Sequence, residues 1–195
     1  MTRALFIVDV QNDFTEGGAL GVDGGDAVAA GISDHLVAHA GEYALIVASR
    51  DWHDPDGDNG GHFALGDARP DFVDTWPVHC VAGTEGAAYD PALRTDAVTH
   101  HVKKGQGVPA YSLFEGTTDA GEKVGDLLTA HGVTGVDVTG IATDYCVRAS
   151  ALDAIAHGLH VRIFTDLVAG VAPASSEAAL AELAHAGAEL TEVSA

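Results

Sequence analysis

The sequence predicts one α/β domain, residues 1–195, built around a parallel β-sheet. A chain of this length supports a single hydrophobic core and buries about 70% of its unfolded surface. Residues 4–8 form an unbroken apolar run, which is typical of a strand buried on both faces of a parallel sheet. A helical pattern at 26–40 and a second apolar run at 44–48 follow it, and this order favours a right-handed β-α-β crossover.

Composition argues against two classes of partner. The chain carries 9 Lys plus Arg against 29 Asp plus Glu, and its formal net charge of −20 repels nucleic acid and anionic membranes. Its apolar stretches are too short to span a membrane and the N-terminus lacks a signal-peptide pattern, so we expect a cytoplasmic protein. In that reducing compartment, Cys80 and Cys146 are expected to stay free thiols.

Strands and helices continue to alternate along the rest of the chain. Apolar periodicity and turn residues predict these elements in order: a strand at 98–102, a helix from a capping-box pair at Asp119 and Glu122 to Gly132, a strand at 136–139, a helix from 147 to Gly158, a strand at 159–164, a helix capped by Ser175 and ending at 186, and an edge strand at 188–191.

The stretch from 133 to 158 combines a strand, a tight turn, a cysteine and a helix. This order places Cys146 in the first helical turn. Free backbone N–H groups and the helix dipole at that position favour a thiolate, so we expect a lowered pKa and a nucleophilic sulfur. The same N–H groups could hold an oxyanion during acyl transfer. A buried structural cysteine is the alternative that this pattern leaves open.

Two charged residues follow buried strands. Asp9 ends the first strand, and Lys104 comes after the third. Open α/β sheets bind ligands at the carboxyl ends of their strands, so both positions suit catalysis. From these residues alone, Asp9 could equally cap a turn, and Lys103 with Lys104 could form a solvated surface pair.

The region at about 51–89 is a long loop rich in Asp, Gly, His, Pro and Trp, and long irregular stretches in compact domains are often functional. Asp51 and His53 are two residues apart, so an extended backbone turns both side chains to the same side. His62 and His79 are candidates for the third and fourth ligands of a metal ion. One carboxylate with imidazoles suits Zn, Fe or Mn, and the spacing does not distinguish them.

Five segments carry a family resemblance: IVDVQNDF at 7–14, DWH at 51–53, WPVHC at 76–80, KKGQGVPAYSLFEG at 103–116 and GIATDYCV at 140–147. In this order they resemble the motifs of the nicotinamidase and pyrazinamidase branch of the isochorismatase-like cysteine hydrolases. The resemblance implies a three-layer α/β/α fold. Its six-stranded, mainly parallel sheet would have the strand order 3-2-1-4-5-6.

The resemblance also implies catalytic roles. Cys146 would be the nucleophile, Asp9 the general acid and base, and Lys104 the ammonium that stabilises the thiolate and holds Asp9. The backbone N–H groups of Ala142 and Cys146 would form the oxyanion hole. A cis peptide bond would precede Ala142.

Substrate and metal sites follow from the same resemblance. The substrate-binding residues would be Phe14, Trp76, Tyr111 and Ile141. One divalent ion, zinc in the first place, would be bound by Asp51, His53, His79 and His62. The segment DPDGDNGG between His53 and His62 is longer than the usual family linker, so His62 could lie elsewhere. The metal would orient a pyridine nitrogen.

We therefore expect an amidohydrolase that converts nicotinamide, and also pyrazinamide, to nicotinate or its analogue and ammonia in NAD salvage. A small-molecule amide is the expected partner, and a homo-oligomer stays open. Three alternatives remain: a related amidohydrolase for carbamoyl or ureido substrates, a vinyl ether hydrolase that would not need the cysteine, and a metal-dependent binding or redox module.

Overall fold

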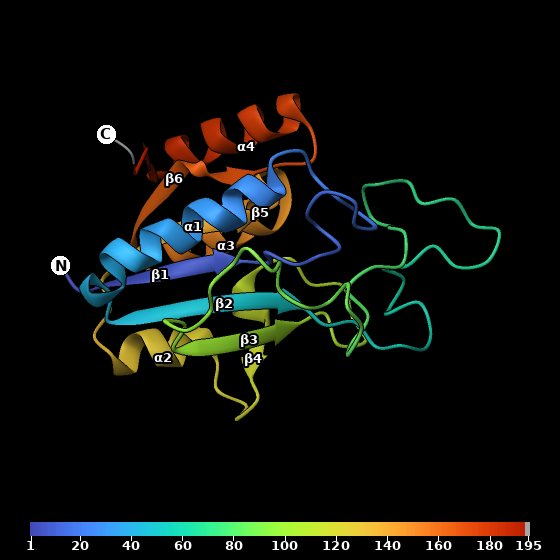
Figure 1. Cartoon of the computed structure of the whole chain (residues 1–195), viewed down its shortest axis with the longest axis horizontal. Helices are drawn as coiled ribbons and strands as arrows, with labels where there is room; N and C mark the ends of the chain where they lie inside the picture. Colours follow the sequence, from blue (N-terminus) through green and yellow to red (C-terminus); the bar gives the residue numbers. More distant parts are fainter. Residues whose placement is uncertain (194–195) are drawn as a thin grey trace.

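The computed structural model describes residues 1–193 and places a mixed sheet at the centre of the chain (Figure 1). Its strands lie in the order β4-β3-β2-β1-β5-β6-β7. The strands are β1 (Arg3–Val8), β2 (Leu45–Asp51), β3 (His100–Lys104), β4 (Thr117–Thr118), β5 (Gly135–Ile141), β6 (His160–Ala169) and β7 (Glu189–Thr191).

Six of these strands are parallel, and their order matches the predicted 3-2-1-4-5-6. The prediction of six strands was wrong by one, because β4 pairs antiparallel with the outer side of β3. β4 contains only Thr117 and Thr118, which is too short for the alternating pattern that marks a strand in a sequence.

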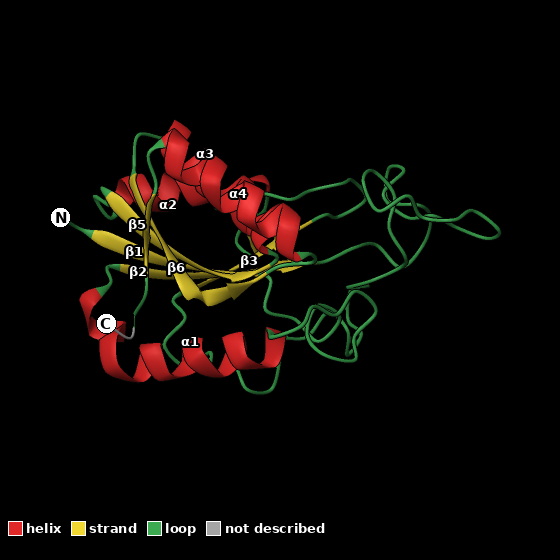
Figure 2. Cartoon of the chain, turned by 90° about the horizontal axis from the view of Figure 1, so that it is seen from above, coloured by secondary structure: helices red, strands yellow, loops and turns green. Residues whose placement is uncertain are grey.

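Helices cover both faces of the sheet (Figure 2). One face is covered by α1 (Gly25–His39). The other is covered by α2 (Val124–Ala130), α3 (Arg148–Ala156) and α4 (Pro173–Ala186). Shorter helical turns lie at Ala40–Glu42, Leu113–Glu115 and Thr143–Val147. Each face has its own apolar cluster, so the sheet is buried on both sides as its continuous apolar strands require.

Two predicted helix caps differ from the structure. The helix near 124 begins after Lys123, and the Asp119 carboxylate instead accepts a hydrogen bond from Lys103 at 2.7 Å. The last helix begins at Pro173, so Ser175 lies inside it rather than at its cap. The local capping patterns therefore gave the wrong boundaries. The contact with Lys103 engages Asp119, and Pro173 starts the last helix.

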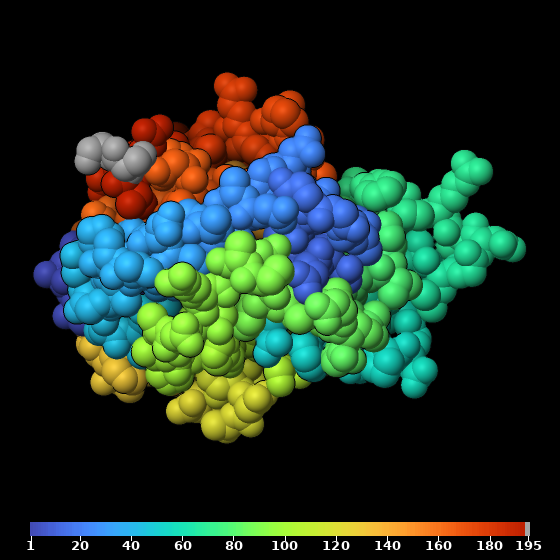
Figure 3. Space-filling view, viewed as in Figure 1, coloured from blue at the N-terminus to red at the C-terminus, as the bar shows by residue number. Residues whose placement is uncertain are grey.

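The carboxyl ends of the central parallel strands meet at one edge of the sheet, and the long loops between β2 and β3 extend beyond this edge (Figure 1). Figure 3 shows part of this loop region projecting from one end of the molecule. The carboxyl ends of these strands and the loops beyond them therefore surround the place where the sequence predicts the functional site. Among residues 1–193, none of the helices is both long and apolar enough to cross a membrane.

Candidate active site

Three predicted catalytic side chains meet at the carboxyl edge of the sheet. The Lys104 ammonium lies 2.9 Å from Oδ2 of Asp9 and 3.6 Å from Sγ of Cys146. All three residues are buried, with exposed fractions of 0% for Asp9, 1% for Lys104 and 7% for Cys146. Because β1 pairs with β5, Asp9 and Cys146 come from neighbouring strands as predicted, while Lys104 reaches them from the end of β3.

The backbone at the end of β1 aims the Asp9 carboxylate into the site. Asp9 has a φ of 47°, in the left-handed region that few residues other than glycine adopt. Oγ of Ser49 donates to Oδ1 of Asp9 at 2.7 Å, and the Asp9 N–H donates to that same Oγ at 3.3 Å. A Cβ on Gly140 would lie 2.1 Å from the Val8 oxygen, so glycine is required for β5 to approach β1 here.

Charges in this cluster stabilise one another. Burial alone would lower the pKa of Lys104, but Asp51 and Asp9 outweigh it and hold this pKa well above its usual value. Burial alone would raise the pKa of Asp51, but Lys104 and the neighbouring histidines hold it well below its usual value. Burial raises the pKa of Asp9, although Lys104 opposes the rise. The lysine is therefore a cation and Asp51 is an anion at neutral pH.

The expected lowering of the Cys146 pKa was wrong. Burial raises the pKa of this thiol well above its usual value, and the attraction of Lys104 only reduces the rise. Cys146 lies in the π-helical turn Thr143–Val147, which precedes α3, rather than in the first turn of that helix. The raised pKa therefore favours the protonated thiol of Cys146 at neutral pH. The Ile141–Ala142 peptide bond is cis, as the resemblance implied.

A second cluster collects the four predicted metal ligands. Nitrogen atoms of His53, His62 and His79 lie within 4.8 Å of one another. Oδ2 of Asp51 lies 3.7 Å from Nε2 of His53 and 3.7 Å from Nε2 of His79. The longer linker has therefore not moved His62 away from the other ligands. The other carboxylate oxygen of Asp51 bonds to Lys104, so Asp51 joins this cluster to the three catalytic candidates.

Backbone carbonyl groups hold two of these histidine rings in place. Nδ1 of His53 donates to the Gly105 oxygen at 2.8 Å, and Nδ1 of His79 donates to the Pro77 oxygen at 2.7 Å. Their Nε2 atoms face Oδ2 of Asp51. Gly105 has a φ of 80°, and a Cβ there would lie 2.6 Å from the His53 ring.

The donor set fits a divalent metal ion. Burial and the neighbouring His53 and His79 lower the pKa of His62 to about 4, so its ring is neutral at neutral pH. Nε2 of His53 and Nδ1 of His62 are buried and have no hydrogen-bond partner within residues 1–193. Buried polar nitrogens without partners are costly, and coordination of an ion would satisfy them.

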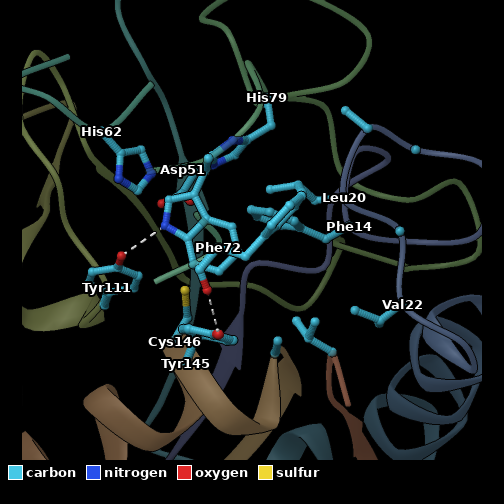
Figure 4. Close-up of a pocket in the computed structure, with 16 residues that line it drawn as sticks. Phe14, Leu20, Val22, Asp51, His62, Phe72, His79, Tyr111, Tyr145 and Cys146 are labelled. Atoms are coloured by element: carbon cyan, nitrogen blue, oxygen red, sulfur yellow. Dashed lines mark hydrogen bonds and ion pairs between the residues drawn. The ribbon is translucent and has the colours of Figure 1, made fainter. Parts of the chain in front are cut away.

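A cavity of about 380 Å³ opens beside both clusters (Figure 4). Nε1 of Trp76 donates to the Tyr111 hydroxyl at 3.0 Å, which joins two of the predicted substrate residues. The cavity is lined by Phe14, Gly18, Ala19, Leu20, Gly21, Val22, Asp51, His62, Phe72, Trp76, His79, Tyr111, Ala142, Tyr145, Cys146 and Val171. Ile141 is not among these residues. Its side chain is fully buried in the apolar cluster on the α1 side of the sheet, so we correct its assignment as a substrate-binding residue.

The sequence did not reveal every residue of the site. Phe72 and Tyr145 line the cavity, and Ser49 holds Asp9. The position of Tyr145 beside Cys146 was a usable signal, and Ser49 lies near the carboxyl end of a strand where ligands bind. Phe72 lies in an irregular loop without periodicity, so nothing in the local sequence marked it.

A family comparison decides the assignment. The model of the isochorismatase domain matches residues 3–195. The chain belongs to the isochorismatase family. A nicotinamidase/pyrazinamidase of Mycobacterium tuberculosis is 48% identical to it over 188 residues, which cover 96% of this chain and 97% of that protein.

Two solved structures have a fold similar to that of this chain. A pyrazinamidase of Pyrococcus horikoshii in complex with zinc has a TM-score of 0.81 and 37% identity, and the match covers 98% of this chain and 99% of that one. PnC1 from L. infantum in complex with nicotinate has a TM-score of 0.83 and 35% identity, and the match covers 99% of this chain and 93% of that one.

Proposed function

We propose that this isochorismatase-family chain is a nicotinamidase, which hydrolyses nicotinamide to nicotinate and ammonia and serves NAD salvage. Pyrazinamide is the second proposed substrate. The observation that carries the proposal is the meeting of Asp9, Lys104 and Cys146 in one buried cluster beside Asp51 and three clustered histidines that could hold a metal ion. Relatives with nicotinamidase activity in their names, and a relative crystallised with nicotinate, support the same substrate.

The first step forms a thioester. The Cys146 thiol transfers its proton to Asp9 as Sγ attacks the carboxamide carbon of the substrate. The negative charge moves from the carboxylate to sulfur and then to the carbonyl oxygen, while the Lys104 ammonium stays between the two side chains. We assign stabilisation of the oxyanion to the backbone N–H groups of Ala142 and Cys146.

The second half of the reaction regenerates the thiol. Asp9 returns its proton to the leaving nitrogen, the carbon–nitrogen bond breaks, and ammonia departs. A water molecule then loses a proton to Asp9 and attacks the thioester carbonyl. Nicotinate leaves when the carbon–sulfur bond breaks, and Sγ of Cys146 takes back its proton. One amide and one water thus give one acid and one ammonia.

The metal site serves binding in this proposal. Asp51, His53, His62 and His79 would hold one zinc ion, because three imidazoles and one carboxylate form a donor set that zinc favours. When bound, the ion would supply a Lewis acid suited to a pyridine nitrogen. Phe14, Trp76 and Tyr111 line the cavity and would hold the ring with its carboxamide toward Cys146. The zinc-bound relative supports this choice of metal.

The test replaces Cys146 with Ala in the metal-loaded protein. The wild type should release ammonia from nicotinamide, and the Cys146→Ala variant should release none above background while it keeps its fold and metal content. Circular dichroism and elemental analysis check the last two points. Retained turnover by the variant would refute the thioester mechanism. Activity on a carbamoyl or ureido substrate without activity on nicotinamide would favour the related amidohydrolase instead.

Metal removal tests the ligand assignment. A chelator should raise KM for nicotinamide or abolish turnover, because the ring would lose its orienting ligand. Added zinc should restore the activity. Wild-type kinetics after complete metal removal would show that the reaction does not require an ion held by these four side chains.

A further inference from the structure

The rim of the cavity carries an aromatic residue that the proposed mechanism does not use. Phe72 lines the cavity, yet 52% of its surface is exposed, so it lies between the cavity and solvent. Its φ is 58°, in the left-handed region that is unfavourable for a bulky residue. Such a conformation persists only where the surrounding contacts impose it.

The Asp71 carboxylate supplies these contacts. Its Oδ1 accepts hydrogen bonds from the backbone N–H groups of Val73, Asp74 and Thr75, each at 2.9 Å. The Asp71 N–H donates to Oγ1 of Thr75 at 3.0 Å, and the Phe72 N–H donates to the Thr75 oxygen at 3.1 Å. Hydrogen bonds within residues 71–75, here called the Asp71 loop, therefore hold this segment in a closed turn that includes Phe72.

A second contact joins the Asp71 loop to the turn Thr143–Val147, here called the Cys146 turn. The Tyr145 hydroxyl donates to the Phe72 backbone oxygen at 3.3 Å, and Figure 4 shows this bond beside Cys146. Trp76 packs edge-on against both residues, with ring centroids 5.0 Å from Tyr145 and 6.0 Å from Phe72. The rim residue is thus held by the neighbour of the nucleophile and by the wall of the cavity.

We propose that Phe72 is a specificity-determining residue whose ring closes the solvent side of the cavity and limits the size of the aromatic ring that the site accepts. Asp71 and Tyr145 are positioning residues that act through Phe72. The inference rests on the proposed amide hydrolysis and deepens it. The other aromatic walls, Phe14 and Trp76, are less exposed than Phe72, so the rim is the side on which a larger ring can be admitted.

Steady-state kinetics with two amides test this role. Nicotinamide is compared with quinoline-3-carboxamide, a benzo-fused analogue that keeps the ring nitrogen and the carboxamide. Phe72→Ala should raise KM for nicotinamide about tenfold with a smaller change in kcat, because an apolar contact to the ring is lost. The ratio of kcat/KM for the larger amide to kcat/KM for nicotinamide should rise by at least about tenfold.

Variants of Asp71 and Tyr145 distinguish the effect of the Phe72 ring from the effect of the residues that position it. Asp71→Ala should shift the same ratio in the same direction by a smaller factor, and Asp71→Asn should restore it in part because Oδ1 remains an acceptor. Tyr145→Phe should also give a smaller shift. Val73→Ala is the matched control, since Val73 lies in the same loop, is 68% exposed and does not line the cavity. Its ratio should stay within about twofold of the wild type.

Calorimetric binding to the metal-loaded protein distinguishes this inference from the proposed function. Nicotinate and quinoline-3-carboxylate are the probes, and Phe72→Ala should shift the binding preference toward the larger acid. An unchanged preference in that variant, with an active wild type, would overturn the role of Phe72 alone. A wild type that binds nicotinate but releases no ammonia would overturn only the proposed hydrolysis. A wild type that binds neither acid would overturn both.

Discussion

Lys104 is the residue that connects the parts of the site. Its ammonium contacts Asp9, Asp51 and Cys146, and it is almost completely buried. A lone buried ammonium would be costly, but two carboxylates compensate its charge. Transfer of the Cys146 proton to Asp9 then moves one negative charge within the cluster and leaves the total charge unchanged. We infer that this is why a thiol with a raised pKa can still act as a nucleophile.

Replacement of Lys104 with Gln should change both rate and pH dependence. We expect kcat to fall by at least about a hundredfold, because the charge that stabilises the thiolate is lost. Burial already raises the pKa of Asp9, and without Lys104 this pKa should rise further. Asp9 must be deprotonated to act as a base, so the acid limb of kcat/KM should move to higher pH. A pH series of residual activity measures the shift.

Lys103→Gln is the matched control for this pH series. Lys103 is the neighbouring strand residue, and its ammonium pairs with Asp119 at 2.7 Å rather than with the site. Its acid limb should coincide with that of the wild type. A Lys104→Gln variant with an unshifted limb and normal metal content would contradict the electrostatic role assigned to Lys104.

Asp144 joins two elements of the fold. It lies in the Cys146 turn, and its carboxylate accepts hydrogen bonds from the N–H groups of Val171 at 3.0 Å and Ala172 at 3.3 Å, and from the Ser175 hydroxyl at 2.5 Å. These groups belong to the start of α4, where a negative charge also interacts favourably with the helix dipole. Asp144 thereby holds the turn against the helix.

Asp144→Ala should therefore lower both stability and activity. Loss of the hydrogen bonds from Asp144 to residues 171–175 should cost about 1 to 2 kcal/mol, which for a domain of this size lowers Tm by roughly 2 to 8 °C. We expect kcat to fall more than KM rises, because the Cys146 turn is displaced while the metal ligands stay in place. Thermal melts and steady-state kinetics measure the two effects. Asp153→Ala, on α3 outside this contact, should show neither effect.

The sequence predicted elements and site residues with different success. The apolar runs predicted the central strands, and their carboxyl ends predicted where Asp9 and Lys104 would lie. The four metal ligands are close together as predicted, because the residues between His53 and His62 form a loop that returns to the site. Local patterns therefore identified the residues that carry charge and ligand chemistry.

Other features depend on contacts that no local pattern contains. Burial raises the pKa of Cys146, so a rule for helix N-termini gave the wrong direction. Ile141 looked like a cavity residue by its place in the motif, but its side chain points into the core. Phe72 lies at the rim in a loop that is held by the Asp71 carboxylate and by the Tyr145 hydroxyl.

At the scale of the whole molecule, an ion cluster around the buried Asp137 links three strands of the sheet. This cluster lies away from the candidate active site. Asp137 on β5 is fully buried and accepts hydrogen bonds from Arg3 on β1, from Arg162 on β6 at 2.7 and 2.6 Å, and from the Tyr43 hydroxyl at 3.0 Å. Burial alone would raise the pKa of Asp137, but the two arginines outweigh it and lower this pKa. The cluster thus stabilises three adjacent strands.

Asp137→Asn should lower the free energy of unfolding by about 2 kcal/mol at pH 7, because two half-buried guanidinium groups lose their buried counter-charge and their charge-assisted hydrogen bonds weaken. Since the folded pKa of Asp137 is lowered, its contribution is present above the unfolded pKa of about 3.9 and is lost as the pH falls through the folded value. The stability curves of variant and wild type should therefore converge in acid. Urea denaturation at a series of pH values measures this.

Glu182→Gln provides the comparison at the surface. Glu182 pairs with Arg148 at 2.6 Å on the exposed side of α4, where solvent screens the interaction. Its urea midpoint at pH 7 should be nearly that of the wild type. An equal loss of unfolding free energy in both variants would mean that burial adds nothing to the stability contributed by Asp137.

A crystal structure of the metal-loaded protein with nicotinaldehyde tests the central claim most directly. This aldehyde offers Cys146 a carbonyl carbon to attack but has no ammonia to release. We predict a covalent bond from Sγ of Cys146 to that carbon, with the oxygen at the N–H groups of Ala142 and Cys146 and the ring nitrogen at the metal. A ring bound in this cavity with its carbonyl turned away from Cys146, or bound outside the cavity, would contradict the account.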